Sequence, residues 1–299
     1  GDMRNSGVEI ELNFTPIRRE HVQWDINLNM THLRNKITML PSERRTKQVD
    51  GYSGYVSGST FFGEGLPMYT FYMRKYAGVS DEGLSMWYMN ETDDKGNPTG
   101  KRVTTTEYAK ASDYLCGDPI PDLYGGFGTS VKWKGLTVSV AFDGQHGGNV
   151  YSYTNAVLGT RGKGSFTLAG RYDGLVLDGV NQLPDGNFIR NTHKTADIVE
   201  YYGLAYAFQN CEQNFVSTEF LKLREIRIAY EFPRQLLARS KFIKGLSLSV
   251  YGRNLYCWSK FPGWDPEGAF MRGASVVPGF EMLQMPGTAT FGGNVRITF

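Results

Sequence analysis

The sequence has few cysteines, little net charge and no long apolar segment, and each shortage excludes a class of protein. Its three cysteines, Cys116, Cys211 and Cys257, have no zinc-ligand spacing, although two of them could pair in an oxidising compartment. No run of 18 or more apolar residues is present, which excludes a transmembrane helix. The formal net charge is only +2, so nothing favours a nucleic-acid partner.

Catalytic and metal-binding motifs are also missing. The four histidines never stand in a HExxH arrangement, and there is neither a G-x-S-x-G elbow nor a phosphate-binding loop. The carboxylates of Asp265 and Glu267 could be imagined as a glycosidase pair, but loop acids are usually just solvated. Asp93 and Asp94 lie in a turn without the ligand spacing of an EF-hand. We therefore expect no enzyme, no metal and no cofactor.

Glycine and aromatic residues, in contrast, are plentiful, with 36 Gly, 18 Tyr, 18 Phe and 5 Trp. The clearest strand is the last segment, 288–299, in which alternate residues are apolar and the others, such as Asn294 and Arg296, are mostly polar. A dozen residues tilted by about 45° rise some 25–28 Å, close to the apolar band of a transmembrane barrel. Phe299 resembles the terminal aromatic signal read by the barrel-assembly machinery.

Six earlier segments alternate in the same way. They are residues 8–14, 22–30, 127–133, 136–142, 220–232 and 246–250. A charged residue such as Lys132 on the lipid face near the middle of the membrane would cost about 2–4 kcal/mol, so the polar members are expected to face inward. Residues 68–77 are the candidate for an eighth strand. The parity of the strands then requires one more between Val79 and Asp122.

Short turns alternate with long connections along the chain. The long connections lie near residues 33–66, 144–214 and 257–286 and are rich in glycine and polar residues. Barrels with short periplasmic turns and long extracellular loops show this asymmetry, whereas sandwiches distribute loop lengths more evenly. The prediction is an all-β, antiparallel transmembrane β-barrel segment over residues 1–299. A soluble or surface-attached glycan-binding β-sandwich is the alternative.

Several segments, in their order and spacing, resemble the C-terminal part of the SusC/RagA family of TonB-linked outer-membrane transporters of Bacteroidetes. They are residues 4–12, Trp24, 35–37, 76–79, 117–127, 144–148, 220–230, 251–255 and 262–266. The resemblance implies a barrel of roughly 22 strands closed by an N-terminal plug. Residues 1–299 would then be about the last third of a longer protein, with the plug and the TonB box outside this sequence.

The resemblance also implies a function and partners. The expected function is import of oligosaccharides or peptides across the outer membrane, with a SusD-like lipoprotein as a lid and coupling to the TonB complex through the missing N-terminal region. Candidate cargo contacts are the aromatic and acidic residues Tyr151, Tyr153, Tyr172, Trp258, Trp264 and Asp265, because aromatic faces stack on sugar rings and acids bind hydroxyls. Packing between loops or an interfacial aromatic girdle is the alternative role for these aromatics.

Arginines among the aromatics of the long connections are candidate contacts for the lid. They are Arg161, Arg171, Arg190 and Arg272. Arginine, tyrosine and tryptophan are the usual anchors of protein interfaces. Such aromatic loops would expose a large apolar area unless a plug, cargo or partner covered them.

Overall fold

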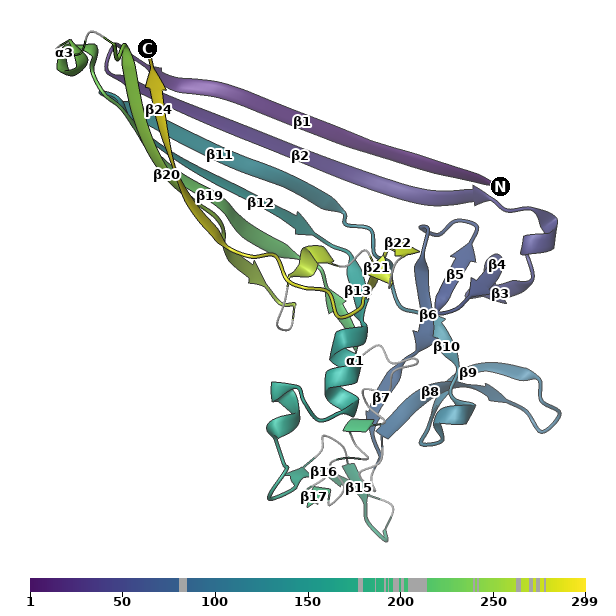
Figure 1. Ribbon diagram of the computed structural model, residues 1–299. Coiled ribbons are helices and arrows are strands. Elements are labelled where there is room, and N and C mark those ends of the chain that lie inside the picture. The colour runs from purple at the N-terminus through teal and green to yellow at the C-terminus, as the bar shows by residue number, and fades with distance from the viewer. Residues whose placement is uncertain are drawn as a thin grey trace.

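The computed structural model contains one large antiparallel sheet and two lobes built from its long connections (Figure 1). It describes residues 1–80, 85–176, 180–185, 187–190, 192, 194–195, 199, 202–203, 214–238, 240, 242–261, 265–268, 271–272, 275–276 and 278–299. Across these ranges, no helix has the length and apolar character needed to cross a membrane.

Seven strands form the large sheet, in the order β1-β2-β11-β12-β19-β20-β24. They are β1 (Asp2–Arg18), β2 (Val22–Met39), β11 (Leu123–Trp133), β12 (Leu136–His146), β19 (Phe220–Glu231), β20 (Gly245–Ser259) and β24 (Thr290–Thr298). Every neighbouring pair is antiparallel. The curved ribbon of strands in Figure 1 is therefore a meander in chain order, interrupted only by the lobes.

The register of the sheet confirms the predicted two-faced pattern. One row of directly opposed residues is apolar in each of the six strands from β1 to β20. It consists of Leu12, Leu28, Phe127, Phe142, Leu223 and Tyr256. A neighbouring row on the other face contains Asn13, Asn27, Gly128, Ala141, Glu225, Arg253 and Thr290. Because directly opposed residues share a face, the whole sheet has one apolar face and one largely polar face.

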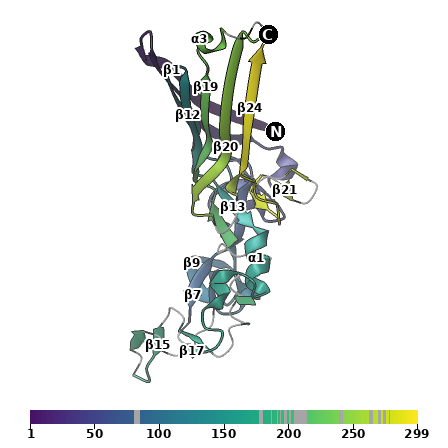
Figure 2. The ribbon, with the colours of Figure 1, turned by 60° about the vertical axis from the view of Figure 1, so that its left-hand side comes forward.

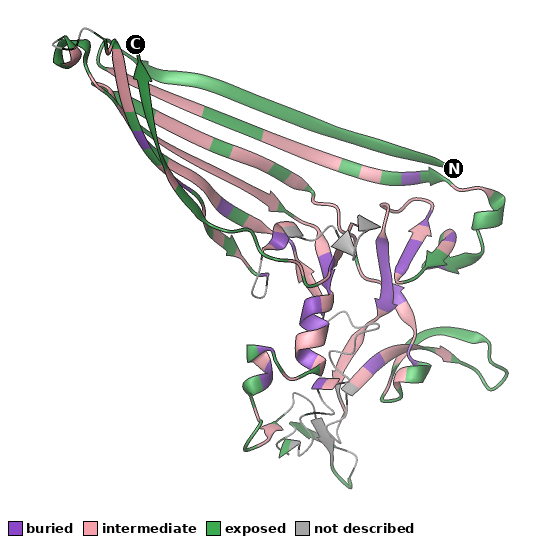
Figure 3. Ribbon diagram, viewed as in Figure 1, coloured by how far each residue is buried: buried purple, intermediate pink, exposed green. Residues whose placement is uncertain are grey.

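The apolar face of the sheet is not packed against another layer. Val8 is 59% exposed, Val250 60% and Val295 66%, although these residues are among the most hydrophobic in the chain. Figure 3 shows the same contrast, since buried positions gather in the lobes and the long strands are mostly intermediate or exposed. Apolar side chains in this position require an apolar surrounding, which for a closed barrel is lipid.

Short turns join the strands at one end of the sheet. Residues 19–21 join β1 to β2, and residues 232–244, with the short helix α3 (Arg234–Leu237), join β19 to β20. Between β11 and β12 the turn has only Lys134 and Gly135, with φ angles of 46° and 90°. Two successive positive φ angles are typical of the two-residue hairpin turns that match the twist of a sheet, and glycine adopts them without strain.

The first lobe lies between β2 and β11. It contains a five-stranded sheet in the order β10-β6-β5-β4-β3 and a three-stranded sheet β7-β8-β9. Its elements are η1 (Ser42–Arg44), β3 (Lys47–Val49), β4 (Tyr52–Ser57), β5 (Thr60–Gly63), β6 (Thr70–Arg74), β7 (Tyr76–Val79), β8 (Ser85–Thr92), β9 (Pro98–Thr105), η2 (Tyr108–Lys110) and β10 (Asp113–Leu115). Val49, Phe61 and Tyr72 form a small buried core between its strands.

The second lobe combines the two later connections. Its elements are β13 (Asn149–Ser152), α1 (Tyr153–Thr160), η3 (Ser165–Leu168), β14 (Leu175–Val176), β15 (Val180–Gln182), β16 (Phe188–Arg190), β17 (Lys194–Thr195), β18 (Phe215–Ser217), η5 (Pro266–Gly268), β21 (Met271–Arg272), β22 (Ser275–Val276) and β23 (Phe280–Glu281). Helix α1 begins at Ser152, whose Oγ accepts a hydrogen bond from the Asn155 N–H at 3.0 Å and so caps a free donor of the first turn. Both lobes lie at the end of the sheet opposite the short turns (Figure 2).

An aromatic cluster fastens the two lobes together. Phe71 of β6 is fully buried, with its ring centroid 4.5 Å from that of Phe215 and 5.8 Å from that of Phe280. Met73 and Tyr151 complete the buried group. Each of the three long connections therefore contributes to one core, as in a soluble domain.

Two details of the predicted strand pattern are wrong. Residues 68–77 contain β6 and the start of β7, but both belong to the first lobe and not to the large sheet. Strand β2 pairs directly with β11, so the large sheet needs no further strand between Val79 and Asp122. The abundance of tyrosine and phenylalanine in residues 68–77 indicated a strand correctly, but aromatic residues favour strands in small soluble-type sheets as well.

The connections also begin later than predicted. Strand β2 continues to Met39, β12 to His146 and β20 to Ser259, so the first, second and third connections start beyond residues 33, 144 and 257. The strand ends beyond these positions contain polar residues and lack a clear apolar alternation. Their backbones are still paired with neighbouring strands, and a hydrophobic pattern does not reveal such pairing.

Candidate functional site

The polar face of the large sheet carries a hollow along β11 and β12. Its floor consists of small residues, including Gly128, Ser130, Ser139 and Ala141, and its volume is about 490 Å³. A Cβ at Gly128 would lie 2.0 Å from Asn27 Oδ1, so the Asn27 amide occupies the space that a side chain would need. The hollow is thus produced by residue size at directly opposed positions of two strands.

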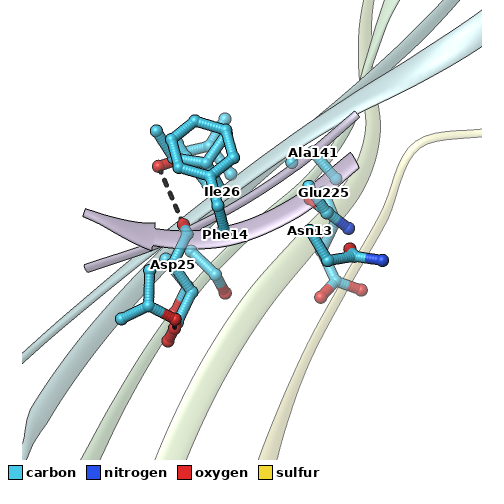
Figure 4. A pocket seen from close by; sticks show the side chains of 13 residues that line it. Asn13, Phe14, Asp25, Ile26, Ala141 and Glu225 are labelled. Atoms are coloured by element: carbon cyan, nitrogen blue, oxygen red, sulfur yellow. Dashed lines mark hydrogen bonds between the residues drawn. The ribbon is translucent and has the colours of Figure 1, made fainter. Parts of the chain in front are cut away.

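Polar and charged side chains stand around this hollow, and β1, β2 and β19 supply them (Figure 4). Asp25 accepts hydrogen bonds from Thr15 Oγ1 at 2.7 Å and from Gln23 Nε2 at 2.8 Å. Opposite, Glu225 accepts a hydrogen bond from Arg253 Nε at 2.6 Å. Carboxylates, amides and hydroxyls that are exposed on a concave surface can bind the polar groups of a passing ligand.

A second cavity, of about 540 Å³, adjoins the hollow toward the lobes and shares Asn27, Gly128 and Ala141 with it. Four aromatic residues, Tyr124, Phe127, Phe142 and Phe220, line this cavity together with polar residues that include Asn29, Gln145, Arg224 and Glu267. The two cavities together form a polar depression that runs along the sheet. Phe14 is the aromatic residue among those that line the first hollow.

An ion cluster lies at the same end of the depression. Lys222 Nζ is 2.9 Å from both carboxylate oxygens of Asp265 and 2.5 Å from Glu267 Oε2. Arg224 Nε donates to Asp143 Oδ1 at 2.5 Å, and Arg224 Nη2 donates to Glu267 Oε1. Two cations from β19 are therefore shared by three carboxylates, of which two come from the connection before β24.

Two register shifts meet at Arg224. The β12–β19 register shifts between Ala141 and Phe142, and the β19–β20 register shifts between Leu223 and Glu225. Arg224 is the extra residue at the first shift, and at the second shift it faces two residues of β20, Asn254 and Leu255. Strict alternation would put Glu225 on the apolar face, but the bulge turns it to the polar face beside Arg224 and restores the apolar alternation at Ile226.

Ion pairing in the cluster controls the protonation of the two loop acids. Burial acts to raise the pKa of Asp265, but hydrogen bonds from Lys222 Nζ and the N–H groups of Glu267 and Gly287 outweigh it, so the pKa lies below its usual range. Burial likewise acts to raise the pKa of Glu267, and the hydrogen bonds from Arg224 and Lys222 reverse the effect. Both acids are therefore ionised at neutral pH.

The structure separates the aromatic residues predicted to contact cargo. Trp258 is opposed to Leu221 and lies on the apolar face, where its ring centroid is 4.7 Å from that of Tyr256. Its position fits the alternative role, an aromatic girdle, and does not fit the polar depression. Tyr151 is 5% exposed and belongs to the aromatic cluster between the lobes, so it too fits the packing role.

Of the remaining predicted residues, Tyr153, Tyr172 and Asp265 are described, and all three lie in the second lobe. Tyr153 begins α1, and Tyr172 is fully exposed in a turn. Among the predicted cargo residues that the structure describes, Asp265 alone lies next to the depression. Trp264 lies outside the described residues.

The four predicted arginines are not equivalent either. Arg161 and Arg190 are exposed, at the end of α1 and in β16 respectively. Arg171 instead stabilises the loop in which it lies. Its guanidinium donates hydrogen bonds to the Thr167 carbonyl, at 2.8 Å, and to the Gly162 carbonyl. The backbone of Arg272 lies in β21.

Sequence reasoning missed the cations of the cluster. Lys222 and Arg224 stand two residues apart in a strand, which alone indicates only that both face the polar side. Their partners Asp265 and Glu267 lie more than 40 positions further along the chain. Within the described ranges no group of histidine, cysteine or acidic side chains could hold a metal ion, and Asp93 of the predicted turn accepts hydrogen bonds from Asn97 and Lys95.

Comparison with known proteins relates this architecture to transporters. No protein-family model matches the chain. Three curated TonB-dependent receptors of Formosa agariphila are 22%, 24% and 22% identical over 90%, 100% and 96% of the chain. The chain spans only 26–29% of the length of these relatives.

Solved structures give the same result for the fold. A RagAB peptide transporter superposes with a TM-score of 0.70 and 20% identity, covering 99% of this chain and 29% of that one. A RagAB peptide importer in a closed-closed state gives a TM-score of 0.68 and 22% identity, covering 99% and 30%. The resemblance to SusC/RagA-type transporters is confirmed. In a SusC/RagA-type barrel the exposed apolar face is the outer one, so the polar depression lies on the inner wall.

Proposed function

We propose that the chain forms part of the wall of an outer-membrane, TonB-dependent importer of the SusC/RagA type. The observation that carries the proposal is the single register in which seven strands place their apolar residues on one exposed face. A glycan-binding sandwich would cover that face with a second sheet, and the described residues supply no such layer. The polar depression then lines the import path.

We propose peptides, ahead of oligosaccharides, as the cargo. Amide and charged side chains such as Asn29, Asp25 and Arg224 line the depression, and these groups complement a peptide backbone and its termini. Trp258, one of the two tryptophans expected to stack on a sugar, faces the other way. Two of the structural neighbours are described as peptide importers, which agrees with this choice.

A lid lipoprotein of the SusD type is the proposed partner, and the TonB complex would act through the region outside this sequence. The second lobe carries exposed residues suited to such a contact, among them Arg161, Arg190 and Tyr172, which is fully exposed. The aromatic cluster leaves the distal hairpins β14–β17 and β15–β16 outside the shared core. These hairpins are the part of the lobe that a lid would cover.

Site-directed spin labelling of the intact protein in lipid tests the barrel assignment. Labels at Val138, Ile228 and Val295 should be accessible to oxygen dissolved in the bilayer, while labels at Ser139, Arg227 and Arg296 should not. The opposite pattern would show that the other face of the sheet meets lipid, because a shift of one residue in the register turns every side chain to the opposite face. An intact protein that migrates equally in gels with and without boiling would contradict the barrel itself.

Uptake of labelled peptides and labelled oligosaccharides by cells carrying the intact gene tests the cargo. Peptide uptake that disappears when the gene is deleted is the expected result. Uptake of oligosaccharides alone would contradict the peptide assignment and would leave the transporter assignment in place.

A further inference from the structure

The ion cluster joins a turn of the third long connection to the inner wall of the sheet. The turn, residues 265–268, contributes Asp265 and Glu267, and it is described here as the acidic turn. Lys222, whose side chain is only 5% exposed, binds both acids. The attachment is therefore made by charge-assisted hydrogen bonds and not by apolar packing.

The acidic turn also organises the start of the last strand. Asp265 Oδ1 accepts a hydrogen bond from the Glu267 N–H at 3.1 Å, and Asp265 Oδ2 accepts one from the Gly287 N–H at 3.1 Å. Asn254 Oδ1 accepts from Arg224 Nη1 at 3.1 Å, while Asn254 Nδ2 donates to the Thr288 carbonyl at 3.4 Å. The turn and the approach to β24 are thus attached to the same two cations.

Glu267 has a second position of interest, since it lines the 540 Å³ cavity together with Arg224. Its side chain is 35% exposed, whereas that of Asp265 is 14% exposed. Of the two acids it is therefore the one that solvent or a ligand reaches first. Its interaction with Arg224 occupies a guanidinium edge that would otherwise face the depression.

The charges are unequal in number. Asp143, Asp265 and Glu267 supply three negative charges, and Lys222 and Arg224 supply two positive charges. Glu267 shares each cation with another acid, because Lys222 is also bound by Asp265 and Arg224 is also bound by Asp143. Departure of Glu267 would therefore leave each cation with one carboxylate partner.

We propose that the acidic turn is a gate at the lobe end of the inner-wall depression, closed by the ion pairs of Glu267 with Lys222 and Arg224. When Glu267 leaves, the guanidinium of Arg224 faces the depression and can bind a carboxylate of the cargo in its place. This inference rests on the proposed function only in taking the polar face as the import path. Its test below measures access and does not require transport.

Cys257 is a natural reporter of the gate, because it is directly opposed to Lys222 on the polar face and its thiol is not in a disulfide. In the intact protein, with its other cysteines replaced by alanine, the rate of labelling by a neutral maleimide is measured against pH. The plateau at high pH, where the thiol is fully ionised, reports access alone.

Glu267→Gln should raise this plateau rate by about tenfold, which corresponds to about 1.4 kcal/mol in the closed–open equilibrium. Asp265→Asn should act in the same direction. In the parent, increasing the salt concentration should speed labelling, and in Glu267→Gln this salt dependence should disappear because the gate is already open. Migration of the unboiled protein in a gel shows that each variant has assembled.

Glu225→Gln is the matched control, because Glu225 pairs with Arg253 on the same face of the same strands without reaching the acidic turn. It should leave the labelling of Cys257 unchanged. Equal plateau rates in the parent and Glu267→Gln would overturn the gate, as would an increase in Glu225→Gln as large as that in Glu267→Gln. Either result would leave the importer assignment untouched.

Discussion

The large sheet and the lobes use the same apolar residue types in opposite ways. In the sheet, Val250 and Val295 are more than half exposed and face outward. In the lobes, Phe71, Phe61 and Val150 are completely buried. The difference lies in the solvent: lipid accepts apolar side chains on the outside of a barrel, whereas water drives them into a core.

Truncation of the lobe core should have the largest effect. Phe71→Ala removes a fully buried ring that contacts Phe215 and Phe280, and such changes typically cost about 3–5 kcal/mol. We expect the lobes to become sensitive to limited proteolysis while the barrel still migrates as a folded species. Tyr172→Ala, at a fully exposed position, is the control that should change neither property.

A charge on the outer face should have the next largest effect. Ile228→Lys places an ammonium in lipid and should destabilise the barrel by about 2–4 kcal/mol if the residue lies near the midplane. Ala229→Lys, one residue further along β19, points to the polar face and should cost much less. Urea unfolding in lipid vesicles measures both, and equal losses would contradict the two-faced sheet.

Removal of the distal hairpins should affect a partner and not the fold. Deleting residues 175–195 removes β14–β17 and β15–β16 but spares β13, α1 and the aromatic cluster. Co-purification with a lid lipoprotein should weaken while the unboiled protein keeps its gel mobility. If co-purification is unchanged, the hairpins serve cargo or self-packing, and the lid contact must lie elsewhere on the lobes.

Acidification should give the smallest effect. Because the pKa of Asp265 is lowered in the folded protein, its contribution to stability is complete above the ordinary carboxyl pKa, about 4, and is lost as the pH falls through the lowered value. The difference in melting temperature between the parent and Asp265→Asn should therefore be widest near pH 7 and should narrow below about pH 4. A difference that stays constant with pH would exclude this ionisation as its source.

Much of the sheet could be predicted because its physical requirement is local. Each strand needs alternate apolar residues, and the register then follows from aligning apolar faces, so the facing of Ile228, Val138 and Val295 follows from the sequence. Residues 68–77 were misplaced because a strand pattern does not say which sheet a strand joins. A segment rich in tyrosine and phenylalanine suits a strand in either surrounding.

The candidate site was far less predictable. It depends on the pairing of Lys222 and Arg224 with acids more than 40 residues away, and on bulges in two adjacent strand pairs. Neither feature has a local sequence signal. Tyr151 and Trp258 were predicted to contact cargo because composition alone does not distinguish an aromatic residue that stacks on a ligand from one in a core or a membrane girdle.

The aromatic cluster has a consequence for how the lobes can change. Phe71, Tyr151, Phe215 and Phe280 come from three connections that are distant in sequence, yet they meet close to the sheet. The cluster is a core that the lobes share. The residues described in it do not include any from the hairpins β14–β17 and β15–β16. Hairpins of different length and composition can therefore be exchanged without altering this shared core, and under the proposed function such exchanges would let one barrel wall meet different lids or cargoes.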